Sequence, residues 1–290
     1  MSLEPETALL EVEHLRVRHR GRRRESMVAV DDVSFTVPPG ETVGLVGESG
    51  SGKTSIARAV LGLIKPEAGN IRFAGNDITS RTLQMRRRLA RELQVVFQDP
   101  YSSLNPARTI GSSLVEPLLG WSRGSRDSAR KQAQTTLRRV GLTADAMERY
   151  PSAFSGGQRQ RIAIARALVM EPKLIVCDEP VSALDLSVQA QILNLLVDLQ
   201  VRERLSYLFI SHDLSVVRHM AHHVLVLQRG RIVEEGSGDK LWNASRQPYT
   251  RLLIDSVPQP DPSKRRDGQA LARSTGPVGS GLNGRTPFQA

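Results

Sequence analysis

The fold of this chain is decided by residues 47–54, which read Gly47-Glu48-Ser49-Gly50-Ser51-Gly52-Lys53-Thr54. Their spacing matches the pattern G-x-x-x-x-G-K-[ST], in which glycines let backbone N–H groups turn inward around a phosphate. A short apolar run, Thr42–Val46, precedes the loop and predicts a buried strand, and a helix is expected to begin near Lys53. The N-terminus of that helix would add a favourable dipole for an anion. This context predicts a nucleotide site, although the same residues in isolation would also suit an ordinary Gly/Ser turn.

The polar residues of the loop have predicted roles. The ammonium group of Lys53 is expected to reach the β- and γ-phosphates, and the hydroxyl of Thr54 is expected to bind Mg²⁺. The predicted nucleotide contacts in this stretch are Gly47, Glu48, Ser49, Gly50, Ser51, Gly52, Lys53, Thr54 and Ser55. The loop alone predicts a nucleotide, but it does not indicate what the nucleotide is used for.

A second apolar run, Leu174–Cys177, ends in two acidic residues, Asp178 and Glu179. By itself such a pair is commonly a turn or a helix cap. In a parallel sheet, however, this strand end would lie beside the phosphate loop. We therefore expect Asp178 to hold Mg²⁺ through its water shell and Glu179 to act as the general base for an attacking water. Cys177 is expected to be a small core residue rather than a nucleophile.

The remaining pattern indicates a mixed α/β fold. Val28–Val37 and Tyr207–Ile210 are predicted strands, and the apolar periodicity of Asp127–Val140 predicts a helix that ends at Gly141. Residues 105–150 carry little strand signal, so we expect a helical insertion between two halves of one α/β core.

Composition excludes several classes of protein. The chain has 290 residues, of which 39% are hydrophobic and 24% charged, so collagen-like and wholly disordered structures are excluded. Its single cysteine excludes an internal disulfide and a zinc finger built on paired thiolates. No run approaches the roughly 20 apolar residues of a membrane-spanning helix. Met1–Val12 has three Glu and no basic residue, so it is not expected to be a secretory signal.

The positive charge of the chain is unevenly distributed. Forty Lys and Arg against thirty Asp and Glu give a net charge of +10. Residues 13–25 carry six Arg and two Glu, a balance of +4, and residues 263–290 carry five basic residues and one Asp, again +4. The second segment is rich in Gly, Ser and Pro and is expected to be flexible. Basic runs are most often solvated surface, but both segments could also face anionic lipid.

A further motif lies at residues 154–161, which read Phe154-Ser155-Gly156-Gly157-Gln158-Arg159-Gln160-Arg161 and open a predicted helix. A Ser-Gly-Gly start leaves backbone N–H groups unpaired, which makes a second anion site without a lysine. With this motif the sequence resembles the ATP-binding cassette (ABC) ATPases, whose dimers hold two ATP molecules between two chains. The resemblance implies that Ser155, Gly157 and Gln158 contact the γ-phosphate held by the phosphate loop of a partner chain.

The resemblance also implies roles for residues that carry no signal on their own. Gln98 resembles the family's metal- and water-sensing glutamine, and Ser182–Asp185 resembles the loop that couples the two sites. His212 resembles the histidine that contacts the γ-phosphate and fixes the catalytic geometry. His19 aligns with a position where the family usually presents an aromatic ring to adenine. We therefore expect binding that is retained but weaker or less selective for adenine.

Two segments resemble one group within the family, the oligopeptide/dipeptide/nickel importer ATPases, and especially the second of their two ATPase subunits. They are Gln98–Pro106 and Gln247–Leu253, the latter with Gln-Pro-Tyr where the group usually has His-Pro-Tyr. The group implies two permease subunits, a second ATPase subunit in a heterodimer rather than a homodimer, and indirectly a solute-binding protein. It also implies a peripheral position on the cytoplasmic face of the bacterial cell membrane, with a permease helix received in a groove beside Gln98.

Together these features predict a P-loop NTPase core at residues 8–99 and 165–235, with a helical subdomain that carries the signature at 100–164. A C-terminal importer-type module is predicted at 236–262 and a flexible basic tail at 263–290. The expected activity is ATP hydrolysis with ATP and Mg²⁺, coupled to the import of peptides or nickel. A soluble ABC ATPase of nucleic-acid maintenance is the alternative, and an exporter cassette with a separate permease is a weaker one. No nucleic-acid partner is expected, because aromatics are only 4% and a second cassette is missing.

Overall fold

The structure is a computed structural model, and it describes residues 8–20, 26–80, 82–99, 103–121 and 125–257. These residues belong to one compact unit that ends at Val257. The predicted basic tail at 263–290 therefore lies outside the described residues, as does the end of the predicted C-terminal module. Part of the arginine-rich segment at 13–25 and Pro100–Ser102 of the importer-like segment also lie outside them.

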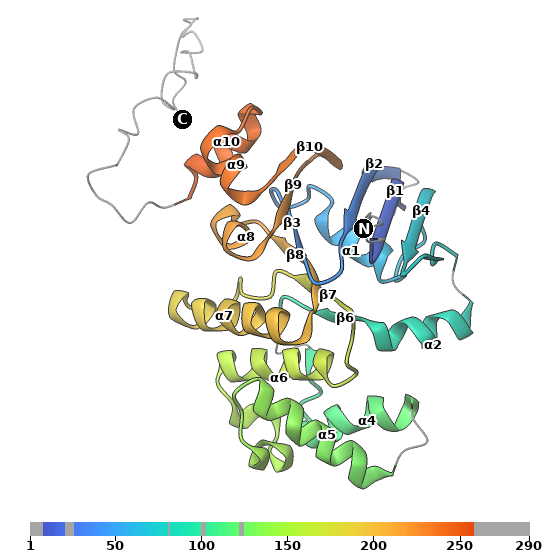
Figure 1. Cartoon of the computed structure of the whole chain (residues 1–290), viewed down its shortest axis with the longest axis vertical. Helices are drawn as coiled ribbons and strands as arrows, with labels where there is room; N and C mark the ends of the chain where they lie inside the picture. The colour runs from blue at the N-terminus through green and yellow to red at the C-terminus, as the bar shows by residue number, and fades with distance from the viewer. Residues whose placement is uncertain (1–7, 21–25, 81, 100–102, 122–124, 258–290) are drawn as a thin grey trace, which may run out of the picture. The chain divides into compact units, whose positions relative to one another are not determined.

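The larger of two sheets has the strand order β10-β9-β3-β8-β7-β6. Neighbouring strands from β9 to β6 are parallel, and β10 pairs antiparallel with β9 at one edge (Figure 1). The strands span Thr42–Val46 (β3), Leu93–Val96 (β6), Leu174–Asp178 (β7), Ser206–Ser211 (β8), His223–Gln228 (β9) and Arg231–Gly236 (β10). The three short apolar runs that predicted buried parallel strands are confirmed as β3, β7 and β8.

The smaller sheet is antiparallel and has the order β2-β1-β4-β5. Its strands span Leu10–Arg20 (β1), Ser26–Val37 (β2), Ala68–Phe73 (β4) and Asn76–Asp77 (β5). The predicted strand Val28–Val37 is confirmed as most of β2. His19 lies near the end of β1, where it pairs with Met27 of β2.

Alternation along the strands divides the core into two layers. Successive residues of a strand point to opposite faces. On β7, Leu174 and Val176 join the cluster that contains α1 and the smaller sheet, whereas Ile175 and Cys177 join the cluster that contains α6, α7 and α8. The larger sheet is therefore covered on both faces, as parallel sheets require, and Cys177 is a buried core residue as predicted.

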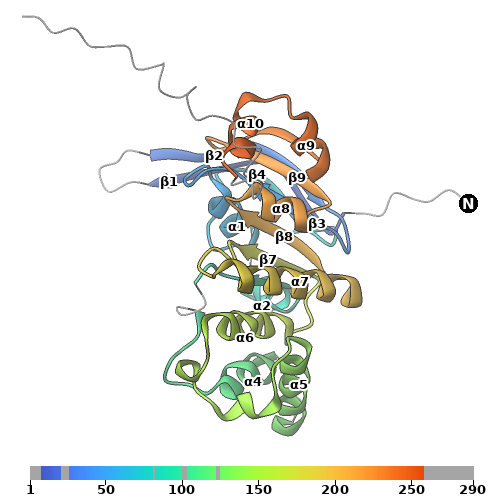
Figure 2. The ribbon, with the colours of Figure 1, turned by 90° about the vertical axis from the view of Figure 1, so that its left-hand side faces the viewer.

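Helices lie on both faces of the larger sheet (Figures 1 and 2). None of the helices in the described part of the chain is long and apolar enough to cross a membrane. The α-helices span Lys53–Val60 (α1), Leu83–Glu92 (α2), Ile110–Trp121 (α4), Arg126–Arg139 (α5), Gly156–Leu168 (α6), Leu186–Glu203 (α7), Leu214–Met220 (α8), Gly238–Ala244 (α9) and Pro248–Asp255 (α10).

The predicted helical insertion consists of α4, α5 and two 3₁₀ turns at Ala144–Glu148 and Pro151–Ala153. The predicted helix Asp127–Val140 is α5, which begins and ends one residue earlier. Ser125 caps its start by accepting a hydrogen bond from the Ser128 N–H group, and Gly141 follows its end with a φ of 78°. The predicted boundary between residues 164 and 165 falls inside α6, because this helix continues from the signature into the core.

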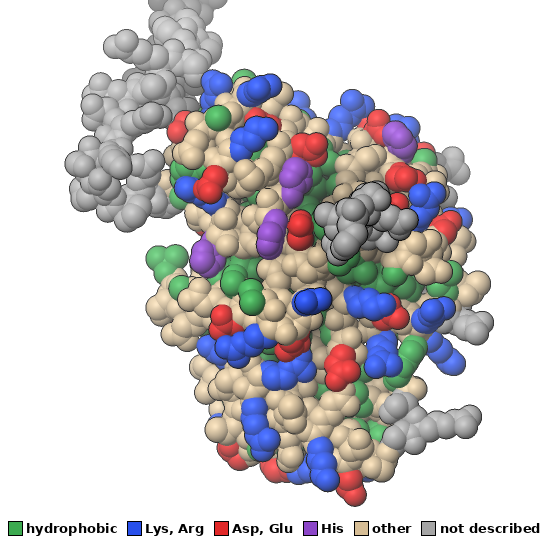
Figure 3. Space-filling model, viewed as in Figure 1, with side chains coloured by type: hydrophobic (Ala, Val, Ile, Leu, Met, Phe, Trp, Pro, Cys, Tyr) green, Lys and Arg blue, Asp and Glu red, His purple; other side chains and the backbone are tan. Residues whose placement is uncertain are grey.

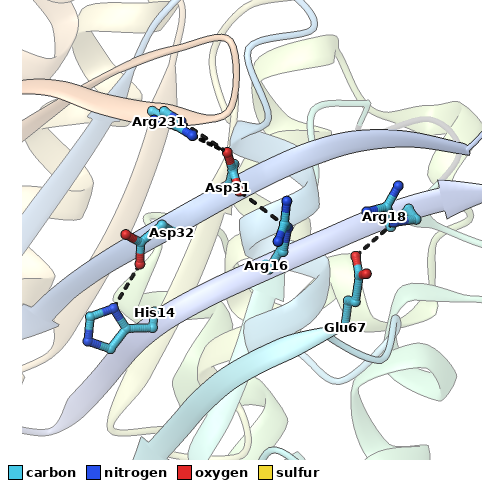
Figure 4. Close-up of polar contacts among 7 residues, drawn as sticks. All are labelled: His14, Arg16, Arg18, Asp31, Asp32, Glu67 and Arg231. Carbon is cyan, nitrogen blue, oxygen red and sulfur yellow. Dashed lines mark hydrogen bonds and ion pairs between the residues drawn. The ribbon is translucent and has the colours of Figure 1, made fainter.

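A row of ion pairs joins the smaller sheet to β10 (Figure 4). Asp31 on β2 accepts from Nε of Arg231 at 3.0 Å and lies 3.3 Å from Nε of Arg16. The hydrogen bond from Arg231 is the main cause that lowers the pKa of Asp31. Exposed pairs of this kind contribute little energy. The backbone supports the same contact, since the Asp31 N–H group donates to the carbonyl oxygen of Gly230 at 2.8 Å.

Candidate functional site

A pocket of about 870 Å³ opens at the carboxyl ends of the parallel strands, where ligands of open α/β sheets bind. The loop after β3 reaches it, as do single residues that follow β6, β7 and β8. The lining residues are His19, Met27, Ala29, Glu48, Ser49, Gly50, Gly52, Lys53, Thr54, Ser55, Gln98, Glu179, His212, Leu252, Leu253 and Ser256. The structure thus brings residues of the phosphate loop together with Gln98, Glu179, His212 and His19, which come from widely separated parts of the sequence. Their roles in catalysis and nucleotide binding stay predictions.

Lys53 lies at the base of the phosphate loop. Its side chain is buried, and Nζ donates hydrogen bonds to the backbone carbonyls of Gly47 at 2.6 Å and Glu48 at 2.8 Å. Burial lowers the pKa of Lys53, while the charges of Glu179 and Asp178 act in the opposite direction. An ammonium group has three protons, so one remains for a phosphate oxygen after these two internal bonds.

The backbone of the loop packs too tightly for side chains at two of its glycines. A Cβ on Gly47 would lie 2.2 Å from the carbonyl oxygen of Leu227, and one on Gly52, whose φ is 110°, would lie 2.4 Å from that of Ala29. The Ser51 hydroxyl is buried and has no hydrogen-bond partner among the described residues. A tightly packed loop that combines an ammonium group with an unpaired hydroxyl fits a polyphosphate.

Thr54 and Asp178 provide oxygen atoms suited to Mg²⁺. The Thr54 hydroxyl donates to Oδ1 of Asp178 at 3.4 Å. Burial raises the pKa of Asp178, and the charge of Glu179 raises it further, whereas Thr54 and nearby cations oppose the shift. The nearby positive charges and the Thr54 hydroxyl do not fully offset the cost of ionising this buried carboxyl, so a bound divalent cation would stabilise the carboxylate. Mg²⁺ typically takes one or two protein oxygens and keeps several waters. Gln98 lines the same pocket, so the predicted metal ligands fit the ion chemically.

Glu179 is held in an unusual backbone conformation beside His212. Its φ is 50°, in the left-handed region that few residues other than glycine adopt. The Glu179 N–H group donates to the carbonyl oxygen of Ile210 at 3.0 Å, and its own carbonyl accepts from the Ser182 N–H group at 3.3 Å. Conformations of this kind cluster at functional sites, where surrounding contacts enforce them. Here they direct the carboxylate to His212, whose Nδ1 lies 3.1 Å from Oε2 of Glu179.

His19 occupies the side of the pocket formed by the smaller sheet. Its Nε2 lies 2.8 Å from Oγ of Ser55, the second residue after Lys53 in α1. A hydrogen bond to a ring nitrogen lies near the plane of the ring. The face of the imidazole is therefore not used by this contact, and the expectation that it stacks on adenine stays a prediction.

The signature residues do not line the pocket of their own chain. Ser155 and Gln158 form a reciprocal capping box at the start of α6, with N···O distances of 3.3 Å and 3.0 Å. Gly157 packs against α7, where an added Cβ would lie 2.5 Å from Cγ1 of Val188. Ser155 and Gln158 are exposed. The N–H groups of Gly156 and Gly157 have no acceptor within the helix, so this end of α6 is available to a ligand held by another chain.

Helix α10 contributes pocket residues that the sequence did not predict. Leu252, Leu253 and Ser256 line the pocket, and the hydroxyl of Tyr249 accepts a hydrogen bond from the Glu48 N–H group at 2.9 Å. Met27 and Ala29 of β2 complete the lining. The contact between Glu48 and Tyr249 spans 201 positions in the sequence, and no local pattern connects the two segments.

Residues 30–182 match a family model described as ABC transporter. This range contains the phosphate loop, Gln98, the signature and the acidic pair. The chain belongs to the ABC transporter family. A second family model, described as the oligopeptide/dipeptide transporter C-terminal region, matches residues 233–289 of this ABC protein, a wider range than the predicted module at 236–262.

Named ABC proteins resemble most of the chain. A Brucella ovis protein that is named as a peptide import ATP-binding protein is 50% identical over 266 residues, which are 92% of this chain and 84% of that protein. The di/tripeptide transport ATP-binding protein DppF of Pseudomonas aeruginosa is 46% identical over 265 residues, or 90% and 82% of the two chains. A solved dimer of the ATP-binding cassette MJ0796 with ADP and phosphate has a TM-score of 0.71 at 27% identity and covers 79% of this chain and 98% of its own. The predicted fold class and family resemblance are confirmed.

Proposed function

We propose that this ABC protein binds and hydrolyses ATP to drive a peptide-type importer. The observation that carries the proposal is the pocket in which Lys53, Thr54, Glu179 and His212 meet, in a chain whose C-terminal region matches oligopeptide/dipeptide transporters. The relatives named for peptide or dipeptide transport support peptides as the substrate class. Nickel complexes share this type of ATPase in the predicted group, and they are the substrate that the assay below distinguishes from peptides.

In the proposed reaction, the phosphate loop and Lys53 hold the phosphates of ATP. Mg²⁺, when held by Thr54 and Asp178, supplies positive charge that offsets the charge developing on the phosphoryl oxygens. Glu179 accepts a proton from the attacking water, and its hydrogen bond to His212 orients the carboxylate. Gln98 reaches the same pocket from the end of β6 and is assigned to the water and the metal.

A second ATPase subunit would complete the site. The signature end of α6 lies outside the pocket of its own chain, and its exposed Ser155 and Gln158 are positioned to serve a neighbour. The proposed closed state therefore contains two chains, each of which supplies a phosphate loop to one nucleotide and a signature to the other. ATP binding would close this pair and hydrolysis would reopen it, a two-state cycle that can drive a coupled protein. We propose a heterodimer, because the sequence resembles the second of the two ATPase subunits of the importer group.

A groove between α2 and α4 suits the cytoplasmic helix of a permease. It has a volume of about 660 Å³ and lies beside β6, the strand that leads to Gln98. Arg87, Arg108 and Glu116 supply charges to its lining, and Pro117 and Trp121 supply apolar surface. Movement of a helix seated here would be transmitted along β6 to the pocket. In this proposal the protein is peripheral on the cytoplasmic face of the bacterial membrane, and two permease subunits form the path across it.

Purification of the full chain with its associated membrane proteins tests this function. We expect two permeases and a second ATPase subunit to co-purify. In nanodiscs the ATPase rate should rise when a solute-binding protein loaded with a peptide is added, and less so with a nickel chelate. A complex that responds only to the nickel chelate would contradict peptide import.

Retention of the chain on DNA at physiological salt without any permease would instead support the nucleic-acid alternative. Figure 3 gives that alternative no support, because the described Lys and Arg side chains on the face shown are interspersed with Asp and Glu.

A further inference from the structure

The backbone of Glu48, in the phosphate loop, is held from two directions. Its N–H group donates to the hydroxyl of Tyr249 at 2.9 Å, and its carbonyl accepts from Nζ of Lys53 at 2.8 Å. Tyr249 is 8% exposed, so the contact is largely shielded from water. A chain of two hydrogen bonds thus connects α10 to the ammonium group that faces the phosphates.

The start of α10 is itself fixed to the larger sheet. Glu234 on β10 accepts hydrogen bonds from the N–H groups of Arg246 at 2.6 Å and Gln247 at 3.3 Å, immediately before the helix begins at Pro248. Burial acts to raise the pKa of Glu234, but these hydrogen bonds, together with the Thr250 hydroxyl and the charge of Arg251, outweigh it, and the pKa is lowered. The start of α10 has no side-chain cap of its own, and the Glu234 carboxylate takes this place by accepting the two N–H groups.

The turn between β9 and β10 contacts the same loop at a second point. The Gly230 N–H group donates to the carbonyl oxygen of Ser51 at 2.9 Å. A Cβ at Gly230, whose φ is 82°, would lie 2.8 Å from the carbonyl oxygen of Ala29. The part of the chain from Gly230 onward is thus connected to the phosphate loop through both Ser51 and Glu48.

Beyond Tyr249, α10 presents apolar side chains to the pocket. Leu252 and Leu253 line it together with Met27 of β2. Leu252 and Met27 are large apolar side chains that are 64% and 65% exposed, which is unfavourable unless a ligand covers them. Ligand pockets are typically lined by apolar side chains with a few polar groups that fix orientation, and the planar base of a nucleotide is an apolar surface of this kind.

We propose that α10 is a wall of the ATP pocket and that Tyr249 is a positioning residue, which holds the phosphate loop in the shape that receives ATP. The proposal rests on the ATPase function stated above. It makes the C-terminal region part of the nucleotide site rather than an appendage to it. By linkage, ATP binding must then stabilise α10 in return.

The first test replaces Tyr249 by Phe, which keeps the ring and removes the hydroxyl. In the full chain we expect the Kd for ATP to rise roughly three- to tenfold, the effect of one lost hydrogen bond. In the assembled importer the KM for ATP should rise by a similar factor, with kcat nearly unchanged. A matched control is Tyr207→Phe, because the buried hydroxyl of Tyr207 donates to the backbone of Leu196 at 3.1 Å, away from the pocket. The control should lower thermal stability without changing the Kd.

The second test uses an exposed residue, so that loss of folding does not confuse the result. Leu252→Asp should weaken ATP binding through charge repulsion and lost apolar contact. Val201→Asp is the control, since Val201 is 75% exposed on α7 and does not line the pocket. Hydrogen exchange provides a third readout, in which ATP should slow exchange of the α10 amides in the unmodified protein and do so less in Y249F.

Each outcome decides one claim. An unchanged Kd and KM in Y249F, together with ATP binding by L252D equal to that of V201D, would overturn the role of α10. Failure of the unmodified chain to bind ATP at all would overturn the ATPase function instead. An equal rise of Kd in Y249F and Y207F would show a general loss of stability and would also contradict positioning by Tyr249.

Discussion

Nδ1 of His212 lies 3.1 Å from Oε2 of Glu179, so the residue that follows β8 and the residue that follows β7 share one hydrogen bond. The side chain of Glu179 is 19% exposed, whereas that of His212 is 56% exposed. The contact therefore fixes one carboxylate oxygen of Glu179, whose side chain is largely buried, through a histidine that also lines the pocket. In the proposed reaction the other oxygen accepts the proton of the attacking water.

Glu179→Gln should preserve the shape of this pair and remove the base. We expect ATP binding to be retained and turnover in the assembled complex to fall by at least about 100-fold, within the range of general-base catalysis. The measurement is phosphate release at saturating ATP, with nucleotide retention measured in parallel. Hydrolysis at the rate of the unmodified complex would contradict the general-base assignment.

Asp178→Asn should raise the stability of the nucleotide-free protein and lower its ATPase activity. The pKa of Asp178 is raised mainly by burial, so the folded protein resists its ionisation. Below the ordinary Asp pKa of 3.8 the carboxyl is protonated in both the folded and the unfolded state, and the stability that the tighter proton binding of the folded state contributes is fully present. As pH rises through the raised pKa of the folded state, that stability is lost, because the native carboxyl ionises at a higher pH than the unfolded one.

At neutral pH the nucleotide-free D178N protein should therefore be more stable than the unmodified protein, because Asn removes the cost of ionising a buried carboxyl. Its Mg²⁺-dependent hydrolysis should be nearly abolished. Thermal unfolding between pH 4 and 8 measures the first effect, and the gain should shrink toward the acidic end. A stability gain that grows as the pH falls would have the wrong sign for this explanation.

His19→Tyr tests the base side of the pocket. His19 lines the pocket and contacts Ser55 through Nε2, and a phenol ring would offer a larger stacking surface. We expect tighter ATP binding and a greater preference for ATP over GTP in the variant, measured by titration of both nucleotides. The same affinity and selectivity in both proteins would remove the proposed role of His19.

Gly157→Ala tests why the signature needs a glycine. The added Cβ would lie 2.5 Å from Cγ1 of Val188, so the Val188 side chain or the start of α6 must shift. We expect ATPase activity of the assembled complex to fall at least about tenfold, by analogy with the cost of displaced catalytic groups. The double variant with Val188→Ala removes both γ-methyl groups of Val188, including the obstructing Cγ1, and should recover most of the activity. Continued inactivity of the double variant would show that close approach of a ligand, rather than packing against α7, requires the glycine.

Much of the fold could be predicted from short apolar runs, because a strand buried on both faces must be apolar at successive positions. For this reason the predicted strands Leu174–Cys177 and Tyr207–Ile210 agree with β7 and β8 to within one residue at each end. The phosphate loop and the acidic pair could also be predicted, because each is a short segment of residues that are adjacent in the sequence. The predicted boundary between residues 164 and 165 falls inside α6, because the continuity of that helix depends on packing in the core.

The part of the site that sequence did not predict depends on distant contacts. Leu252 and Leu253 look like any amphipathic helix face, and Tyr249 like a buried aromatic. Only the packing of α10 beside the phosphate loop makes them neighbours of Glu48. The sequence likewise does not predict the hydrogen bond between His19 and Ser55, because this contact depends on how the smaller sheet lies over α1.

The capping box at Ser155 and Gln158 sits at one end of a continuous helix whose other end, at Leu168, is fully buried. A helix of 13 residues is about 20 Å long, so a tilt of about 10° about the buried end displaces the signature by about 3 Å, roughly the length of a hydrogen bond. In the proposed pair of chains, a small rotation of α6 about its buried end would therefore move the signature into or out of hydrogen-bonding distance of the partner chain's nucleotide, without unfolding any turn.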